Sequence, residues 1–453
     1  MSDRDGGDFG DEIEMKTLLG EDDELDEDVS ELPISDPTVA PFSPSNKGHG
    51  HGGHGGHGHG GAPGTASSSS VAANIFISFV GAGILGLPSA FSKGGWVLSS
   101  GITAIVCFLS VKAMMLLIET RKILEEKGHN DVEGYGDVGR IVSGARGENL
   151  VNLFLVISQT GFATAYIIFI SRNLLSVFGM PSLVTCLCVI PFLGYLVNLR
   201  SMAGLAPFSL FADFANILGL FIVFCQDVSY LPLNHEHVTA FNFSYLLYVT
   251  SVTVYCFEGV GLILPLESSS ADRQGFPRLL SIVLASITCL MICFGTLGYM
   301  GFGHETLSPI TLNLSGPIAN VVKLSLCTGL YLTYPVMMFP VNTVLEEVFS
   351  VSYGSKSVRF RVMVVIGTSF IAWSVPDFGV FIAFVGASIC MILGFVMPAY
   401  FHLQVLDGKA TPKQKMIDYG LIAFGVVMGS LGTLESGKDL IDVVVFGKDL
   451  DAE

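Results

Sequence analysis

Eleven apolar segments of 17 residues or more follow one another from residue 71 to residue 434. A bilayer core of about 30 Å needs roughly 20 apolar residues per helix, so each segment is long enough to be a candidate membrane span. The pattern therefore predicts an all-α polytopic membrane protein with eleven transmembrane helices. The expected spans are 71–91, 95–119, 148–179, 181–199, 204–226, 242–266, 277–301, 313–347, 358–374, 377–403 and 417–434.

Two of these segments are interrupted by glycine and proline at matching depths. The first interruption is Gly81-Ala82-Gly83-Ile84, followed by Pro88, and the second is Glu258-Gly259, followed by Pro265. In hydrocarbon every backbone N–H and C=O needs a partner, so a helix is broken only beside protein or a water-lined cavity. Paired breaks in corresponding positions of two halves point to the binding site of a secondary transporter.

Composition supports the membrane assignment and argues against a water-soluble enzyme. Only 14% of the residues are charged, against about 25% in soluble domains. The nine cysteines lie in or at the ends of apolar segments without CxxC spacing, so we expect neither a disulfide framework nor a metal site. The pattern indicates no enzyme, no cofactor and no nucleic-acid partner.

The net charge of −17 is concentrated in a tail. Residues 1–36 hold fifteen acidic residues against Arg4 and Lys16, and such blocks repel themselves and stay disordered. We therefore expect a disordered cytosolic tail over 1–70, a transporter domain over 71–435 and a short lumenal tail over 436–453. Residues 48–61 contain only glycine and histidine, which indicates a low-complexity linker or a weak metal-binding tract.

One short motif in the tail suggests a destination. Glu14 precedes Leu18-Leu19 in the spacing of an acidic dileucine signal, which clathrin adaptors bind on cytosolic tails. The motif predicts sorting to a vacuolar, lysosomal or endosomal membrane rather than to the plasma membrane.

Basic residues predict the orientation. With a cytosolic N-terminus, the cytosolic loops hold fourteen Lys and Arg residues and the opposite loops hold only Lys93 and Arg172. Positive residues concentrate on the cytosolic side of membrane proteins. The eleven-helix count then places the C-terminus in the lumen.

The strongest candidate for chemistry within the membrane is Glu258. Ionisable groups in membrane helices are costly and mark functional sites by default, and burial favours the neutral acid. Glu258 is thus a candidate proton carrier or a partner for a substrate amine. The structural alternative is a protonated Glu258 that hydrogen-bonds freed carbonyls of the first broken helix.

Other polar positions within the expected spans are weaker candidates for a functional role. Glu267, just past Pro265, is expected to be solvated or part of a gate. Asp213 is expected to accept a hydrogen bond between helices, with a coupling role as the alternative. Gln159 and Thr333 are candidates for the lining of the cavity. The glycines of the first break let N–H groups at a half-helix N-terminus point at a carboxylate, or serve close helix packing.

Four stretches in the same order resemble the amino acid/auxin permease family of the APC superfamily, closest to its vacuolar and proton-coupled amino acid transporters. They are NIFISFVGAGILGLP (74–88), LAPFSLFAD (205–213), YCFEG to LPLE (255–267) and FVGAS to GFVMP (384–398). The resemblance covers roughly residues 70–435.

The resemblance implies a fold of two inverted five-helix repeats, with helices one and six unwound, plus an eleventh helix. It implies proton-coupled symport of neutral amino acids by alternating access. Carried over to this chain, the substrate-binding residues are Gly81, Ala82, Gly83, Ile84, Tyr255, Phe257, Glu258 and Gly259, with Gln159 and Thr333 beside them. Animal proton-coupled members carry a histidine in helix one, whereas this chain has Asn74 near that point. Glu258 is therefore the candidate proton carrier, and a sodium site that uses Thr333 is the alternative.

Two other functions stay open from the sequence. An amino acid sensor would bind the same substrate with little flux and signal through the long tail. A metal-ion transporter is suggested by the histidine tract, yet none of the five histidines outside the tail lies in the middle of an expected span.

Overall fold

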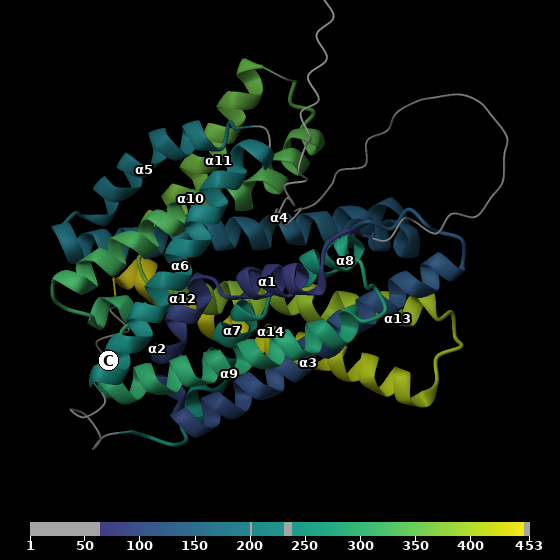
Figure 1. The fold of residues 1–453 in the computed structure, drawn as a ribbon, viewed down its shortest axis with the longest axis horizontal. Helices are drawn as coiled ribbons and strands as arrows, with labels where there is room; N and C mark the ends of the chain where they lie inside the picture. Colours follow the sequence, from purple (N-terminus) through teal and green to yellow (C-terminus); the bar gives the residue numbers. More distant parts are fainter. Residues whose placement is uncertain (1–63, 200–201, 231–237, 353, 448–453) are drawn as a thin grey trace, which may run out of the picture. The chain divides into compact units, whose positions relative to one another are not determined.

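Long apolar helices make up most of the chain in the computed structural model (Figure 1). The structure describes residues 64–199, 202–230, 238–352 and 354–447, without the side chains of residues 202–210 and 230. Within these ranges nine helices are long and apolar enough to cross a membrane, and the bent pair formed by α1 and its continuation makes ten. The chain is therefore a multi-pass membrane protein.

The helices of the first half are α1 (Ser68–Phe79), the 3-10 turn η1 (Ala82–Gly86), α2 (Leu87–Gly94), α3 (Trp96–Glu126), α4 (Tyr135–Phe178), α5 (Ser182–Leu196) and α6 (Met202–Tyr230). Those of the second half are α7 (Leu246–Cys256), α8 (Val260–Ser269), α9 (Phe276–Phe302), α10 (Pro317–Val348), α11 (Ser355–Ser374), α12 (Phe378–Val385), α13 (Met397–Val405) and α14 (Pro412–Phe446). Short 3-10 turns at Phe243–Tyr245, Gly303–Glu305 and Ile310–Asn313 lie in the loops.

Local sequence sets several of the helix ends. Gly95 separates α2 from α3 with φ of +85°, a conformation that glycine adopts without steric cost. Asp377 begins α12 by accepting a hydrogen bond from the Val380 N–H at 2.9 Å. Thr411 and Gln414 form a capping box at the start of α14, which satisfies donors that a helix start leaves free.

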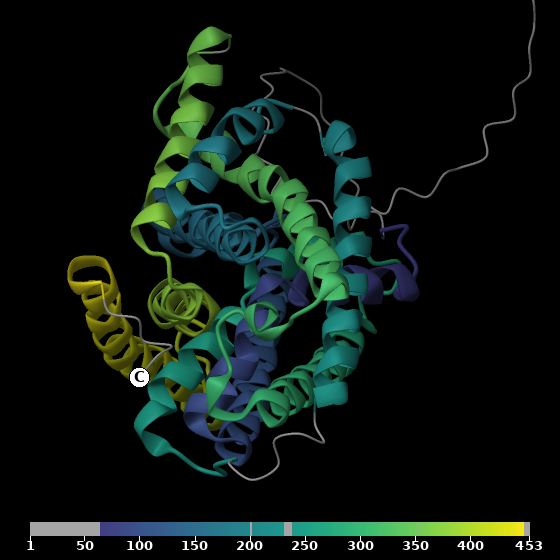
Figure 2. The ribbon, with the colours of Figure 1, turned by 90° about the vertical axis from the view of Figure 1, so that its left-hand side faces the viewer.

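The helices pack in two groups that meet at the broken helices. One group comprises α1, α2, α3, α7, α8 and α9, and the other comprises α4, α5, α10 and α11 (Figures 1 and 2). Helix α6 packs against both groups, on α9 of the first and α10 of the second. In this packing α3 contacts α9, α4 contacts α10 and α5 contacts α11. The short helix α8 contacts both α3 and α4, so the second break lies where the groups join.

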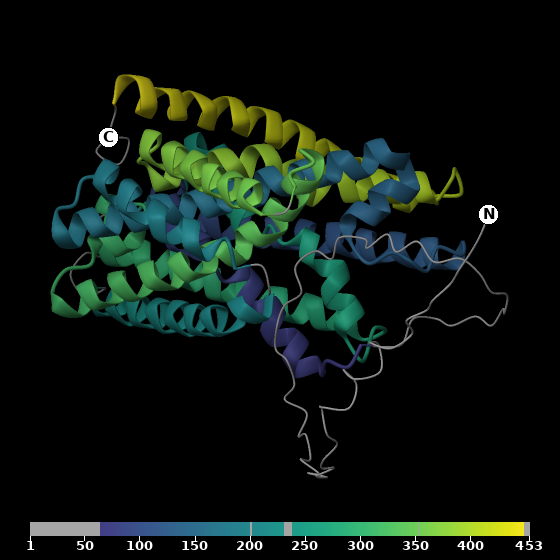
Figure 3. The ribbon, with the colours of Figure 1, turned by 90° about the horizontal axis from the view of Figure 1, so that it is seen from above.

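The last helices form a side layer. The segment from α12 to α13 passes through two π-helical turns, Gly386–Cys390 and Ile392–Val396, and α14 packs along it (Figure 3, yellow). Gly425 and Gly429 of α14 face Met391 of this segment. Glycine there lets the two backbones approach closely, as in other membrane helix pairs.

Helix is present in every one of the eleven expected segments, with different ends. The start of α4 lies at Tyr135, earlier than expected, and a kink at Gly144 separates its first turns. Helix α14 continues to Phe446, so residues 436–446 of the expected C-terminal tail are helical. With 15 residues, α5 is shorter than the nine helices that are long enough to cross a membrane. Glu14, Leu18, Leu19 and the histidine tract lie outside the described residues.

Candidate substrate site at the two helix breaks

The first break separates α1 from α2. Helix α1 ends at Phe79, Gly81 is extended (φ −113°, ψ −164°), and η1 begins at Ala82. The axes on the two sides of the break differ by 44°. The first N–H groups of a helix have no acceptor within that helix. In η1 the first hydrogen bond of the turn is donated by the Ile84 N–H to the Gly81 carbonyl, at 3.3 Å.

The second break separates α7 from α8. Helix α7 ends at Cys256, and Gly259 (φ −177°, ψ 10°) precedes the first residue of α8, Val260. The Glu258 N–H makes a long bond of 3.4 Å to the Tyr255 carbonyl. Glu258 thus lies between two helix ends, as the sequence predicts.

The two breaks pack directly on each other through aromatic rings. A Cβ at Gly259 would lie 2.5 Å from Cζ of Phe79, the last residue of α1. A Cβ at Gly83 would lie 2.9 Å from the Tyr255 ring, near the end of α7. Each break therefore contributes a glycine that the other break covers with a ring. For Gly83 and Gly259 close packing is the role of the glycine.

Gly81 has a different environment. A Cβ built there meets no described atom within 4 Å, and the residue is half-buried. Open space and the free N–H groups at the start of η1 thus coincide at this position. Of the two uses expected for glycine, close packing is observed at Gly83, and at Gly81 the space beside the backbone is open.

Several buried polar atoms around the breaks have no hydrogen-bond partner among the described residues. They include the Tyr255 hydroxyl, Glu258 Oε1 and the Ser158 hydroxyl of α4. Buried polar groups are nearly always satisfied in folded proteins, so such atoms mark a place for a ligand or water. Because Glu258 Oε1 bonds to no carbonyl of α1 in the described structure, the structural alternative for this residue loses its support.

The surroundings of Glu258 are neutral. The side chains of Tyr135, Tyr255 and Cys390 lie within electrostatic range of its carboxyl group. No ion pair joins Glu258 to a basic side chain in the part of the chain that the structure describes. A charge on this carboxyl group would therefore have no counter-charge among the described side chains.

The sequence pattern does not identify three residues of the site, which are Ser158, Phe162 and Cys390. Ser158 is close to Cys390, and the Phe162 ring meets the Tyr255 ring edge-on with centroids 4.7 Å apart. The sequence instead singles out Gln159, the next residue of α4. Consecutive residues of an α-helix are rotated by about 100° around its axis, so the two side chains point in different directions. No local signal identifies Ser158, because the rotation of α4 is set by its packing.

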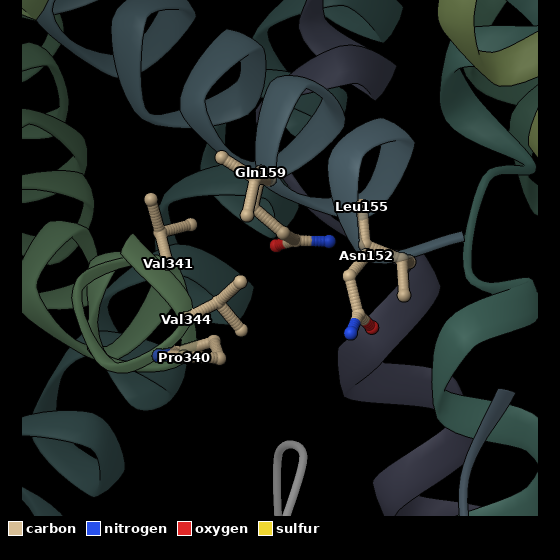
Figure 4. Close-up of a pocket in the computed structure, with 7 residues that line it drawn as sticks. Asn152, Leu155, Gln159, Pro340, Val341 and Val344 are labelled. Carbon is tan, nitrogen blue, oxygen red and sulfur yellow. The ribbon is translucent and has the colours of Figure 1, made fainter. Parts of the chain in front are cut away.

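Gln159 lies in a separate pocket (Figure 4). This pocket has an empty volume of about 260 Å³ and lies between α4 and α10. Its lining is Asn152, Leu155, Val156, Gln159, Pro340, Val341 and Val344, with no residue of either break. Thr333 is also absent from this lining, and its hydroxyl donates to the Gly329 carbonyl at 2.9 Å in its own helix.

The outer ends of the broken helices are held differently. The Ala66 N–H, just before α1, donates to the Ser269 carbonyl at 3.0 Å, and the Ala271 N–H donates to the Ala66 carbonyl at 3.0 Å. Helix α8 is held by Arg121 of α3, whose guanidinium reaches Glu267 Oε2 at 3.2 Å and the Ser268 hydroxyl at 2.9 Å. The expectation of a solvated Glu267 is wrong, because its side chain is buried against Arg121.

No metal site accompanies these residues. Within the described ranges there is no group of three or more His, Cys, Asp or Glu side chains that could hold a metal ion. The sites that the geometry offers are hydrogen-bonding ones, formed by backbone N–H groups, hydroxyls and one carboxyl group.

Comparison with known proteins identifies the class. Residues 64–436 match the family model described as transmembrane amino acid transporter protein. The chain belongs to this family, and it is therefore a transporter rather than an enzyme.

Individual relatives agree. The chain is 36% identical over 406 residues to the amino acid transporter AVT3C of Arabidopsis thaliana, covering 84% of this chain and 92% of the relative. It is 29% identical to vacuolar amino acid transporter 3 of Saccharomyces cerevisiae strain S288c, over 80% of this chain and 55% of the relative.

Among solved structures, the chain is similar to Mhp1, a nucleobase-cation-symport-1 family transporter. The TM-score is 0.49 with 12% identity, over 87% of this chain and 98% of the other. A similarity at this level carries no argument about function here.

Proposed function

We propose that this chain moves neutral amino acids across a vacuolar or lysosomal membrane by proton-coupled symport with alternating access. The observation that supports the proposal most directly is the site itself. Open space at Gly81 and the unsatisfied Tyr255 hydroxyl and Glu258 Oε1 belong to two breaks that pack on each other.

The substrate's carboxylate and amine would be held at opposite sides of this space. The free N–H groups at the start of η1, at Gly81, Ala82 and Gly83, suit a carboxylate, because a helix N-terminus attracts negative charge. The ammonium group would meet the Tyr255 hydroxyl or the end of α7. The rings of Phe79, Phe162 and Tyr255 surround the breaks, and these apolar surfaces favour an uncharged substrate side chain.

Glu258 is proposed to carry the coupling proton. Its Oε1 atom is buried among neutral side chains without a hydrogen-bond partner in the described structure, and a charge in such a place is costly unless it is paired. A bound proton removes that cost, so a proton on Glu258 and the substrate can occupy the site together, as symport requires. Sodium coupling through Thr333 is the alternative, since the Thr333 hydroxyl donates its proton to the Gly329 carbonyl and keeps its oxygen lone pairs for a cation.

The finer fold is also a proposal: eleven transmembrane helices, ten of them in two inverted repeats of five. Contacts between α3 and α9, α4 and α10, and α5 and α11 support it, because each pair holds corresponding positions in the two halves. Basic residues favour a cytosolic N-terminus and a lumenal C-terminus.

Vacuolar sorting would use the Glu14-Leu18-Leu19 motif and a clathrin adaptor. The relatives named vacuolar transporters support this destination. Replacing Leu18 and Leu19 with Ala should move a tagged chain to the plasma membrane, and unchanged vacuolar localisation would exclude the motif.

Proteoliposomes test the function. The purified chain should accumulate one or more radiolabelled neutral amino acids when a pH gradient is imposed, and empty liposomes should not. Ligand-induced thermal stabilisation without flux would instead favour the amino acid sensor. Uptake of Mn²⁺ or Zn²⁺ without amino acid uptake would favour the metal-ion transporter.

A further inference from the structure

A second carboxyl group, that of Asp227 near the C-terminal end of α6, is fully buried. Its side chain is 0% exposed, and neither Oδ1 nor Oδ2 has a hydrogen-bond partner among the described residues. Buried aspartates are rare unless paired. The sequence pattern does not single out this residue.

Asp227 lies where three helices meet. A Cβ at Gly298 of α9 would lie 3.3 Å from Asp227 Oδ2 and 2.8 Å from the Cβ and Cγ atoms of Pro88 of α2. Gly298 therefore lies between the Asp227 carboxyl group and the Pro88 ring. Because α2 directly continues η1, this junction is connected to the first break by only a few residues.

Titratable groups on the neighbouring helices make their own contacts at this end. The Tyr299 hydroxyl of α9 bonds to the Thr239 N–H at 2.9 Å, and the His304 ring packs edge-on against Tyr299. Lys323 of α10 donates to Ser176 Oγ and the Leu314 carbonyl. Lys93 of α2 lies over the Tyr248 ring at 5.0 Å. In the described structure Asp227 forms no ion pair with any of these residues.

An ionised carboxylate in this position would be a buried charge without compensation, which is far more costly than the neutral acid. Movement of α2 and α9 away from α6 would admit water and remove that cost. The packed junction would therefore hold a proton on Asp227 more strongly than an open junction that admits water.

We propose that Asp227 is a second proton-binding site, occupied while α2 and α9 pack against α6 and emptied when this junction opens. The proposal rests on the proposed transport function only for its role in coupling. The binding of the proton itself is a property of the closed junction. Since Glu258 lies at the other break, the two carboxyl groups would respond to different movements.

Infrared spectroscopy tests proton occupancy without any need for transport. At pH 7, wild-type protein should show a carbonyl stretching band of a neutral carboxylic acid that Asp227→Asn lacks and Asp227→Glu restores. Glu305→Gln, an exposed acid in the turn after α9, is the matched control and should keep the band. An identical neutral-acid spectrum in wild type and Asp227→Asn would overturn the proposal.

Chemical labelling covers the case in which Asp227→Asn does not fold. A lipid-soluble carbodiimide reacts with protonated carboxyl groups in apolar surroundings, and peptide mapping of wild-type protein at pH 6 should find Asp227 modified. Modification of Glu258 but not of Asp227 would overturn the proposal.

Transport then tests the coupling role. In proteoliposomes, Asp227→Asn should keep amino acid exchange at equal pH within about twofold of wild type and lose most accumulation driven by a pH gradient. Full gradient-driven accumulation by Asp227→Asn would overturn the coupling role. Wild-type protein that moves no amino acid, but shows the Asp227 infrared band, would refute the proposed function and leave the proton site standing.

Discussion

The two helix breaks have the same architecture and different chemistry. The first offers open space at Gly81 and no ionisable side chain, whereas the second carries Glu258 and is covered at Gly259 by the Phe79 ring. Their outer ends differ as well, because α1 is joined to the end of α8 by backbone hydrogen bonds and α8 is held to α3 by the Arg121–Glu267 ion pair.

This difference suggests a division of labour. Backbone N–H groups have fixed positions and cannot change charge, so the first break is suited to recognising the group that all amino acids share. A carboxyl group can gain or lose a proton, so the second break is suited to coupling. Five tests of this comparison follow, in order of decreasing expected effect.

The largest effect should come from Arg121→Ala at the anchored end of α8. Glu267 would remain as a buried charge without its partner, which costs about 3–5 kcal/mol of unfolding free energy. Thermal unfolding in detergent measures the loss. Arg273→Ala is the control, because its 3.5 Å pair with Glu125 is more exposed and such pairs contribute about 0.2–1 kcal/mol. Equal losses would show that the buried pair has no special role.

Alanine substitutions at Gly259 and Gly81, which have different surroundings, should distinguish a role in packing from a role in substrate binding. Gly259→Ala places a Cβ against the Phe79 ring, and overpacking of this kind costs about 1–3 kcal/mol. Gly81→Ala has room for its Cβ, so stability should hold while substrate affinity falls. Thermal unfolding and substrate binding together measure both effects. A destabilised Gly81→Ala with normal affinity would refute the open site at the first break.

Glu258→Gln should remove coupling and keep binding. The amide cannot exchange a proton, so accumulation driven by a pH gradient should fall at least about tenfold while exchange at equal pH continues. Uptake measured with and without the gradient distinguishes the two. Glu126→Gln, at the exposed end of α3, should behave as wild type. Unchanged gradient-driven uptake by Glu258→Gln would exclude Glu258 as the proton carrier.

Tyr255→Phe should have a smaller effect. It removes a buried hydroxyl that lacks a partner in the described structure, so folding should not suffer. If substrate bonds to this hydroxyl, its loss costs about 1 kcal/mol, or roughly fivefold in KM. Phe162→Leu, which alters the facing ring without a polar atom, serves as the comparison. An unchanged KM for Tyr255→Phe would place the substrate away from α7.

Deletion of residues 48–61 should have the least effect. The site at the breaks involves no residue of the histidine tract, so amino acid transport should remain at the wild-type rate in proteoliposomes. A large loss of flux would connect the tract to transport and revive the metal-ion alternative.

The sequence by itself determined that the chain is a multi-pass membrane protein and where two of its helices are broken. These features are local, because a bilayer requires long apolar runs and a helix break needs glycine or proline wherever it occurs. The candidate residues Gly81, Gly83, Glu258 and Gly259 follow from that pattern alone.

Only the tertiary structure decided what each residue contacts. Helix rotation places Ser158 rather than Gln159 beside the breaks, and packing between distant segments covers Gly83 with Tyr255 but leaves Gly81 open. The same packing pairs Glu267 with Arg121 and buries Asp227 without a hydrogen-bond partner among the described residues. Such contacts join residues far apart in the chain, and no local pattern of apolar and polar positions encodes them.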